Sequence, residues 1–253
     1  MIIRKSAAEI EKMAAAGEIL VRTHRIVEGR IRPGVTTAEL DEAAESFIRS
    51  QGAVPAFKGY QGFPASICAS PNSMVVHGIP GPTKLDRGDI VSVDIGVTLD
   101  GWVADAARTF PVGEVEPEAE RLMAVTEASL HDGVSACLVG GRLGDISNAI
   151  QACVEAEGFS IVRSLVGHGI GRAMHEDPQV PNYGPRGKGP KLEEGMVLAI
   201  EPMVAVGGGT VRVADDNWSV FTTDGSLAAH FEFTVAITAD GPRILTPWHL
   251  DGE

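Results

Sequence analysis

The feature that constrains the fold most is a hairpin pattern in residues 90–110 of this 253-residue chain. Apolar side chains alternate with small or polar ones along its first half, the two-residue period of a half-buried strand. Asp100-Gly101 follows, and this pair is the strongest short signal for a two-residue turn with positive φ angles. Such a turn sets the register of both strands, so that Gly96 faces Asp105. We therefore expect an antiparallel β-hairpin here.

The same register brings two carboxylates to one face of the hairpin. Asp94 lies two positions from Gly96 and therefore on the side of Asp105, diagonal to it. Diagonal neighbours in a sheet are about 7–8 Å apart, and the ions of a dinuclear site are about 3.5–4 Å apart. Both carboxylates can thus hold one metal cluster, with Gly96 leaving room for the ions. The alternative is a pair of solvated aspartates on an ordinary polar strand face.

Charge and composition narrow the range of partners. The formal net charge is −13, which argues against nucleic acid or an anionic membrane as the main partner. No stretch approaches the roughly 20 apolar residues of a membrane span, and the opening residues lack the long apolar run of a secretory signal. The cysteines are sparse and include no CxxC pair. These features predict a cytoplasmic protein in a reducing compartment.

Helices and strands are expected in the same order twice. Capping boxes, a proline at a first turn and stopping glycines predict helices at residues 6–29, 36–52, 117–138 and 145–157. Apolar and alternating runs predict strands at 66–70, 90–110, 161–168, 196–206, 210–214, 218–222 and 229–238. This order indicates an α+β fold of two related halves that share one sheet system. Because no low-complexity linker separates the halves, we expect a single domain over residues 1–253.

Three further candidate metal ligands lie in the second strand region. His168 stands between two glycines, which let the backbone approach a ligand closely; the alternative is a hydrogen-bonded structural histidine. Glu201 ends an apolar strand just before Pro202. Glu232 lies in the middle of the predicted strand at 229–238. A carboxylate there either points to water at a sheet edge or is paired, because an unpaired buried carboxylate is too costly.

Taken together, these motifs resemble the methionine aminopeptidase family, and more specifically its short type I bacterial form. The resemblance covers essentially the whole chain and rests on the Asp94–Asp105 spacing, GHGIG around His168, HEDP at 175–178, IEPM around Glu201 and FEFT around Glu232. His77, in MVVHGIP, also matches the substrate-side histidine of the family. The resemblance implies the pita-bread fold, in which two pseudo-symmetric halves with antiparallel sheet enclose a dinuclear metal site and helices lie outside.

The resemblance also implies the cofactors. Two divalent ions per chain would be held by five residues: Asp94 on one ion, Asp105 and Glu232 as bridges, and His168 and Glu201 on the other. Charge supports this assignment independently, since four carboxylates balance two divalent ions and a neutral imidazole adds no charge. An oxygen-rich site with one nitrogen suits Mn, Fe(II), Co or Zn. The family further implies a monovalent cation near Asn72.

The implied activity is removal of N-terminal methionine from nascent proteins, at the ribosome, when the second residue is small. Water activated by the metal ions would attack the first peptide bond. Glu201 would accept a proton from that water, and His175 would stabilise the developing oxyanion. His77 would contact the substrate amide or the leaving nitrogen. We expect a monomer.

A methionine pocket is implied by the same resemblance. It would be lined by Tyr60, Phe63, Cys68, His77, Met174, His175 and Trp218, with Phe57 near the rim. Sulfur–aromatic contacts favour a thioether by about 0.3–1.5 kcal/mol each, although an aromatic and methionine set is more often ordinary core. The chain departs from the family pattern at positions that bear on substrate preference and metal affinity, namely Phe63, Val103, Ala104, Ala106, Ala107, Met174 and Phe233.

Two other functions compete with this interpretation. An Xaa-Pro dipeptidase or aminopeptidase P uses the same ligand types, and Asp94-Ile-Gly96 and Arg108-Thr109 are similar to that branch. However, IEPM rather than IEPG, and the absence of a large domain before the catalytic residues, point away from it. The other alternative is a non-catalytic pita-bread protein that binds peptides, histones or RNA. All five ligands and both site histidines are present, and the acidic balance disfavours RNA.

Overall fold

The computed structural model describes residues 1–250, and this part of the chain contains four α-helices. They are α1 (Ala7–Glu28), α2 (Thr37–Ser50), α3 (Pro117–Ser135) and α4 (Leu143–Ala156). The capping boxes expected before α1 and α2 are both present. In each, a hydroxyl at the cap accepts from the backbone N–H three residues on, and the glutamate there accepts from the cap N–H. All four helices lie where the sequence predicts them.

The predicted hairpin is the centre of the first half. Strands β4 (Ile90–Leu99) and β5 (Trp102–Pro111) pair with Gly96 opposite Asp105, the register expected from the turn. Asp100 and Gly101 both have positive φ, as that turn requires. On its other edge β4 pairs with β1 (Val54–Pro55) and β2 (Ile67–Pro71), which completes a four-stranded antiparallel sheet.

The part of the chain that the structure describes contains three further sheets. The second half contains a five-stranded sheet in the order β15-β14-β9-β7-β8 and a three-stranded sheet in the order β13-β10-β6. Their bounds are β6 Ser160–Ile161, β7 Gly167–Gly169, β8 Glu176–Val180, β9 Val197–Ile200, β10 Met203–Ala205, β13 Ala228–His230, β14 Phe233–Thr238 and β15 Gly241–Ile244. A small sheet links the halves through β3 (Met74–Val76), β12 (Val220–Thr222) and β11 (Val211–Val213).

Three of the predicted strands are interrupted, and two of the interruptions fall at candidate ligands. The strand expected at 196–206 is divided into β9 and β10 by Glu201-Pro202, where proline has no N–H for a ladder. The strand expected at 229–238 is divided into β13 and β14 by Phe231-Glu232, so Glu232 is not in mid-strand. Residues 161–168 likewise form two short strands with a loop between them. The short strands β1, β3, β8 and β15 were not expected, because their sequences carry little alternation.

Two threonines join the halves. The Thr234 hydroxyl donates to the carbonyl of Asp105 (2.7 Å) and accepts from its N–H (3.0 Å). The Thr109 hydroxyl makes the same pair of bonds with His230, at 2.9 and 3.0 Å. Between them Glu232 N–H donates to the Ala107 carbonyl at 2.9 Å. These contacts run in opposite directions along β5 and the β13–β14 segment, so the two sheet systems meet as an antiparallel pair.

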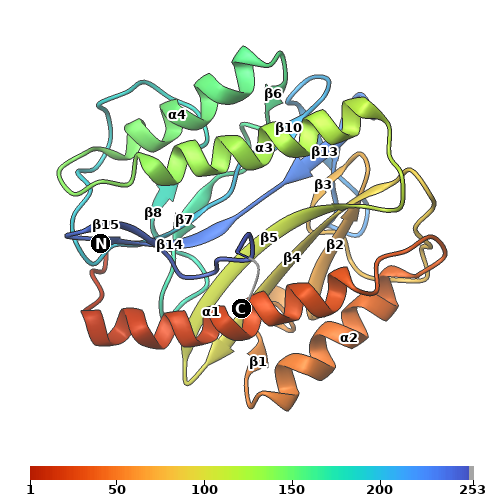
Figure 1. The fold of residues 1–253 in the computed structure, drawn as a ribbon, viewed down its shortest axis with the longest axis horizontal. Coiled ribbons are helices and arrows are strands. Elements are labelled where there is room, and N and C mark those ends of the chain that lie inside the picture. Colours follow the sequence, from red (N-terminus) through yellow and green to blue (C-terminus); the bar gives the residue numbers. More distant parts are fainter. Residues whose placement is uncertain (251–253) are drawn as a thin grey trace.

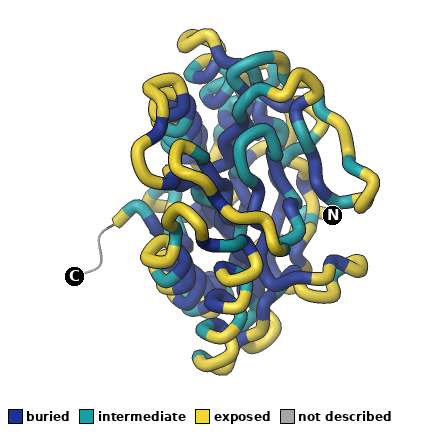
Figure 2. The backbone as a smooth tube through the Cα atoms, turned by 90° about the vertical axis from the view of Figure 1, so that its right-hand side faces the viewer, coloured by how far each residue is buried: buried dark blue, intermediate teal, exposed yellow. Residues whose placement is uncertain are grey.

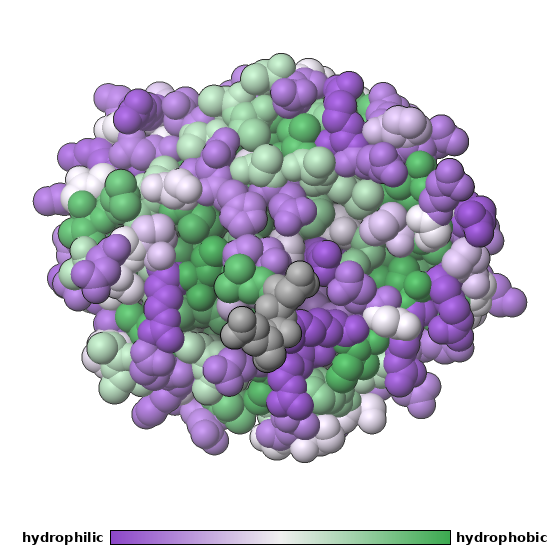
Figure 3. Space-filling view, in the orientation of Figure 1, coloured by the Kyte–Doolittle hydropathy of each residue, from purple (hydrophilic) through white to green (hydrophobic). Residues whose placement is uncertain are grey.

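The helices cover one side of this sheet system. Figure 1 shows α1 and α2 beside the β4–β5 hairpin, and α3 and α4 beside the strands of the second half. Buried backbone runs through the strands, and the exposed segments are mainly loops and the outer turns of helices (Figure 2). Hydrophilic side chains are spread over the face in Figure 3, interrupted by smaller hydrophobic groups. Within residues 1–250, none of the helices is long and apolar enough to span a membrane.

Candidate active site

A cavity of about 240 Å³ receives side chains from both halves. Every residue that the sequence proposes for divalent metal binding, catalysis or the methionine pocket lies on its wall. They are Tyr60, Phe63, Cys68, His77, Asp94, Asp105, His168, Met174, His175, Glu201, Trp218 and Glu232. The structure therefore brings together residues that span most of the length of the chain.

The carboxylates reach the cavity from two kinds of backbone. Asp94 and Asp105 project from β4 and β5 in the unbroken hairpin. Glu201 and Glu232 come from the two interruptions, which lie opposite each other, because Ile200 pairs with Phe233 before them and Met203 with His230 after them. His168 lies on β7 and pairs with Ala199, one strand away from these interruptions.

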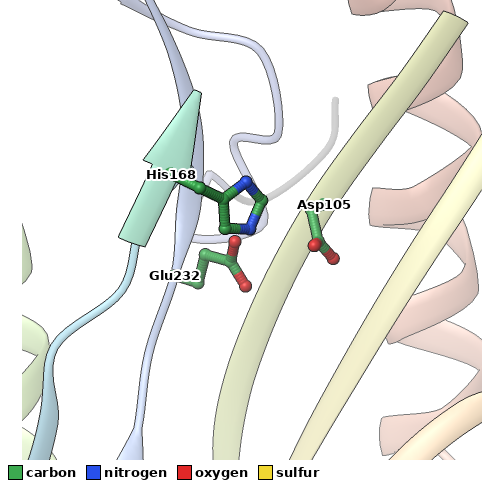
Figure 4. Close-up of side chains that lie close together, drawn as sticks. All are labelled: Asp105, His168 and Glu232. Atoms are coloured by element: carbon green, nitrogen blue, oxygen red, sulfur yellow. The ribbon is translucent and has the colours of Figure 1, made fainter. Parts of the chain in front are cut away.

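Three of the five candidates form a compact group. One potential ligand atom from each of Asp105, His168 and Glu232 lies within 4.8 Å of the others, and the three side chains point toward one another in Figure 4. The fourth, Glu201, places Oε1 3.6 Å from His168 Nε2. His168 donates from Nδ1 to the carbonyl of Gly169 at 2.9 Å, which leaves the Nε2 lone pair facing the group. This is the tautomer that a metal ligand needs.

Three of the four carboxylates in the cavity each have an oxygen without a hydrogen-bond partner among the described residues. Asp94 Oδ1, Asp105 Oδ1 and Glu232 Oε1 are buried and have no hydrogen-bond partner within residues 1–250. Burial raises the pKa of Asp94 to about 7 and that of Glu201 to about 8, and it raises the pKa of Asp105 and Glu232 well above the usual value. Burial also lowers the pKa of His168 to about 4, so the imidazole is neutral. Divalent cations fit these residues, because they would balance the carboxylates and occupy the free oxygen and nitrogen lone pairs.

The candidate methionine pocket adjoins these carboxylates. Phe63 meets Trp218 edge to face with ring centroids 5.1 Å apart. Cys68 pairs with Asp94 across β2 and β4, and burial, followed by the nearby carboxylates, raises the pKa of its thiol well above the usual value. Cys68 is therefore a neutral pocket side chain. The lining combines apolar, aromatic and sulfur-containing groups, which suits an unbranched apolar side chain.

Gly96 serves this pocket rather than the ions. A Cβ at Gly96 would lie 2.7 Å from Phe57 Cε1 and 2.8 Å from Met174 Cε. The expectation that Gly96 leaves room for metal ions is therefore wrong, because the ends of two pocket side chains fill that space. Phe57, expected near the rim, is buried, lines the cavity and lies beside Gly96.

Two candidate catalytic histidines line the cavity from loops beside different strands, His77 directly after β3 and His175 directly before β8. His175 Nδ1 is 2.7 Å from the Tyr60 hydroxyl, and its ring centroid is 4.3 Å from that of His168. His77 has a left-handed backbone, with φ of 59°, and its ring lies edge-on to Trp218. Burial lowers the pKa of His175 and brings that of His77 to about 4, so both rings are neutral at pH 7.

The sequence did not single out His230 as a site residue. Its ring is buried in the cavity wall, with Nε2 3.6 Å from Glu201 Oε2, and neither ring nitrogen has a hydrogen-bond partner within the described residues. Its spacing of two from Glu232 was the available signal, since both residues were expected on one strand face. Gln61, Val76, Leu165, Val166 and Met203 also line the cavity and were not predicted.

A buried group of carboxylates with a neutral imidazole, beside an apolar pocket, is the arrangement of a metal-dependent enzyme. The family model "Metallopeptidase family M24" matches residues 11–239. A methionine aminopeptidase from Clostridium perfringens is 56% identical over 97% of this chain and 99% of its own length. Methionine aminopeptidase 1 from Bacillus subtilis is 53% identical, over 97% of this chain and 99% of its own.

Solved structures agree with these relatives. The methionine aminopeptidase of Rickettsia prowazekii superposes with a TM-score of 0.96 at 42% identity, covering 97% of this chain and 100% of its own. A prolidase from Pyrococcus horikoshii has a TM-score of 0.78 at 23% identity, and the match covers 97% of this chain and 64% of the prolidase, which shows the shared fold alone. The chain belongs to metallopeptidase family M24 and, within it, to the methionine aminopeptidases. Its fold is the pita-bread fold predicted from the sequence.

Proposed function

We propose that this chain removes the N-terminal methionine of nascent polypeptides whose second residue is small. The observation that carries the proposal is the junction of the buried carboxylate group with an apolar pocket in one cavity, in a chain 56% identical to a methionine aminopeptidase. The proline-specific alternative has less support, since the prolidase of the same fold is only 23% identical, whereas the methionine aminopeptidase relative is 56% identical.

The proposed metal ligands are Asp94, Asp105, His168, Glu201 and Glu232, which would hold two ions of Co, Mn, Fe(II) or Zn. Bound there, the ions would polarise the scissile carbonyl and make water a nucleophile at neutral pH. A monovalent cation near Asn72 stays a prediction, as do a monomeric state, a cytoplasmic location, a single domain and action at the ribosome.

The histidines supply hydrogen bonds to the substrate. Because Tyr60 can donate its hydroxyl proton to His175 Nδ1, the Nε2–H of this neutral ring is free to donate to the carbonyl oxygen as it becomes an oxyanion. Glu201, beside His168, accepts a proton from the attacking water and returns it to the leaving nitrogen as the peptide bond breaks. His77, on the Trp218 side of the cavity, contacts the substrate amide or the leaving nitrogen.

Hydrolysis of short peptides tests the proposal. Chelator-stripped protein is supplied in turn with Mn, Fe(II), Co or Zn and assayed on Met-Ala-Ser, Met-Val-Ser and an Ala-Pro peptide. We expect metal-dependent release of methionine, faster from Met-Ala-Ser than from Met-Val-Ser, and no cleavage of the Ala-Pro peptide. Preferred cleavage of the Ala-Pro peptide would establish the proline-specific alternative. A folded, metal-loaded protein that cleaves none of them would establish a binding protein.

A further inference from the structure

We propose that Lys5 is a positioning residue for His175 and acts through Glu176. Neither Lys5 nor Glu176 lines the cavity, and Lys5 lies in the segment before α1, far along the chain from the proposed catalytic residues. The inference rests on the proposed function, because it is there that His175 is given a part in catalysis.

The ion pair between Lys5 and Glu176 is buried. Lys5 Nζ lies 2.7 Å from Glu176 Oε2, and the two side chains are only 2% and 7% exposed. Among the described pairs of lysine or arginine with a carboxylate, it alone has both side chains below one-tenth exposure. Removal of one partner from such a pair leaves a buried charge without compensation, which is far more disruptive than loss of a surface pair.

The second oxygen of Glu176 organises the backbone just before His175. Glu176 Oε1 accepts from the N–H of Arg172 at 2.9 Å and from the N–H of Ala173 at 3.2 Å. The Glu176 side chain thus bonds back to the backbone of residues 172 and 173. These bonds close a short loop that runs from residue 172 to Glu176 at the start of β8. Met174 and His175 are the two residues that this loop presents to the cavity.

Gly171 makes the close approach feasible. A Cβ at Gly171 would lie 2.5 Å from Lys5 Cε and 2.7 Å from Glu176 Oε1. No larger residue fits at this position without displacing the ion pair, so the glycine, the lysine and the glutamate form one unit.

Lys5 is itself fixed by backbone contacts. Its N–H donates to the carbonyl of Gly195 at 2.6 Å, and Gly195 N–H donates to Ile237 at the end of β14. Lys5 Nζ also donates to the carbonyl of Ile3 at 3.3 Å. The pair thus ties the loop that carries His175 to β14, one of the strands that flank the carboxylate group. We infer that it holds the His175 ring at its distance from His168 and Tyr60.

The test uses Lys5→Met, which keeps the length of the side chain and removes its charge. We expect kcat on Met-Ala-Ser to fall roughly 10-fold to 100-fold, because small displacements of a catalytic group are costly. Bound manganese, measured by calorimetric titration, should be unchanged. Arg4→Met is the matched control, since Arg4 pairs with Glu193 in the same segment but both side chains are about half exposed. Its kcat should stay at the wild-type value.

A double variant separates positioning from general damage. In a His175→Ala background, Lys5→Met should lower kcat no further, because the ring that it positions is gone. A further fall of the same size would overturn the inference, as would a wild-type kcat for Lys5→Met. If Lys5→Met does not fold by circular dichroism, Glu176→Gln replaces it in both backgrounds. A wild-type protein that releases no methionine would instead refute the proposed function, so the two failures are distinguishable.

Discussion

The two halves of the site hold their carboxylates in different ways. In the first half, Asp94 and Asp105 belong to an unbroken hairpin whose two strands pair along their whole length. In the second half, Glu201 and Glu232 stand where two paired strands are interrupted at the same level. Regular strand structure therefore orients the two aspartates, whereas an interruption between paired strands orients the two glutamates. We call this interruption the gap.

The gap is stabilised by side chains that replace the missing ladder bonds. The Glu201 carbonyl accepts from Asn182 Nδ2 at 2.9 Å, and the Glu232 carbonyl accepts from the Trp248 indole at 2.9 Å. Glu232 N–H is bonded to Ala107 of the other half. Buried backbone groups need partners, and here tertiary contacts supply them. The comparison teaches that the first pair depends on local sequence, whereas the second depends on residues distant along the chain.

The largest expected effect is the loss of kcat/KM when one proposed metal ligand is removed. Removing one ligand from each half tests whether the halves contribute equally to activity. Asp105→Asn and Glu232→Gln should each lower kcat/KM on Met-Ala-Ser by on the order of 1000-fold, because a lost metal ligand removes several kcal/mol of transition-state stabilisation. Asp240→Asn, in an exposed turn, is the control. Steady-state kinetics and metal analysis measure the effect. If only one variant loses activity, the two halves are not equivalent partners at the metal centre.

The next effect concerns chemistry rather than metal binding. His175→Ala should lower kcat by about 100-fold, the size expected for one oxyanion donor, with bound manganese unchanged. Tyr60→Phe should have a smaller effect, because it removes only the hydrogen bond to His175 Nδ1. Turnover at the wild-type rate in His175→Ala would remove this residue from the mechanism.

A matched pair of substitutions sharpens the comparison at the junction of the halves. Thr234→Val and Thr109→Val each leave a buried N–H and a buried carbonyl without a hydroxyl partner, which should cost about 1–3 kcal/mol in the free energy of unfolding. Urea unfolding in the presence of chelator measures this loss. Only Thr234→Val should also weaken manganese binding, because Asp105 is the proposed ligand. Equal weakening by both would show that the junction acts as one unit.

An effect of similar size on the free energy of unfolding is the pH dependence that His24 contributes in the first half. His24 of α1 donates from Nε2 to the Ala106 carbonyl of β5 at 3.0 Å, and burial lowers its pKa from 6.5 to about 4. The unfolded chain takes up this proton below pH 6.5, while the folded protein does so only near pH 4. Stability is thus unaffected at pH 7 and falls as the pH drops from 6.5 toward 4.

Lowering the pH from 7 to 5 should therefore cost roughly 2 kcal/mol through His24. Urea unfolding of the wild type and of His24→Gln, compared at both pH values, isolates this contribution from that of the other histidines. We expect a flatter pH dependence in His24→Gln. Identical slopes for the two proteins would contradict a neutral, buried His24.

The sequence by itself determined the local elements. Capping residues placed α1 and α2, and Asp100-Gly101 set the register that puts Asp94 and Asp105 on one face, because these signals act over a few residues. The motifs also gave the family, which the relatives confirm. The roles of the site residues follow from that resemblance and remain predictions.

Only the tertiary structure decided how the second half meets the first. An apolar run around Glu201 or Glu232 looks like a continuous strand, since nothing local shows that Asn182, Trp248 and Ala107 take over its hydrogen bonds. The space at Gly96 was likewise assigned to ions, although distant side chains fill it. His230 and the Lys5–Glu176 pair could also be recognised only in the structure. Their importance lies in burial and in contacts across the fold, which no local pattern in the chain encodes.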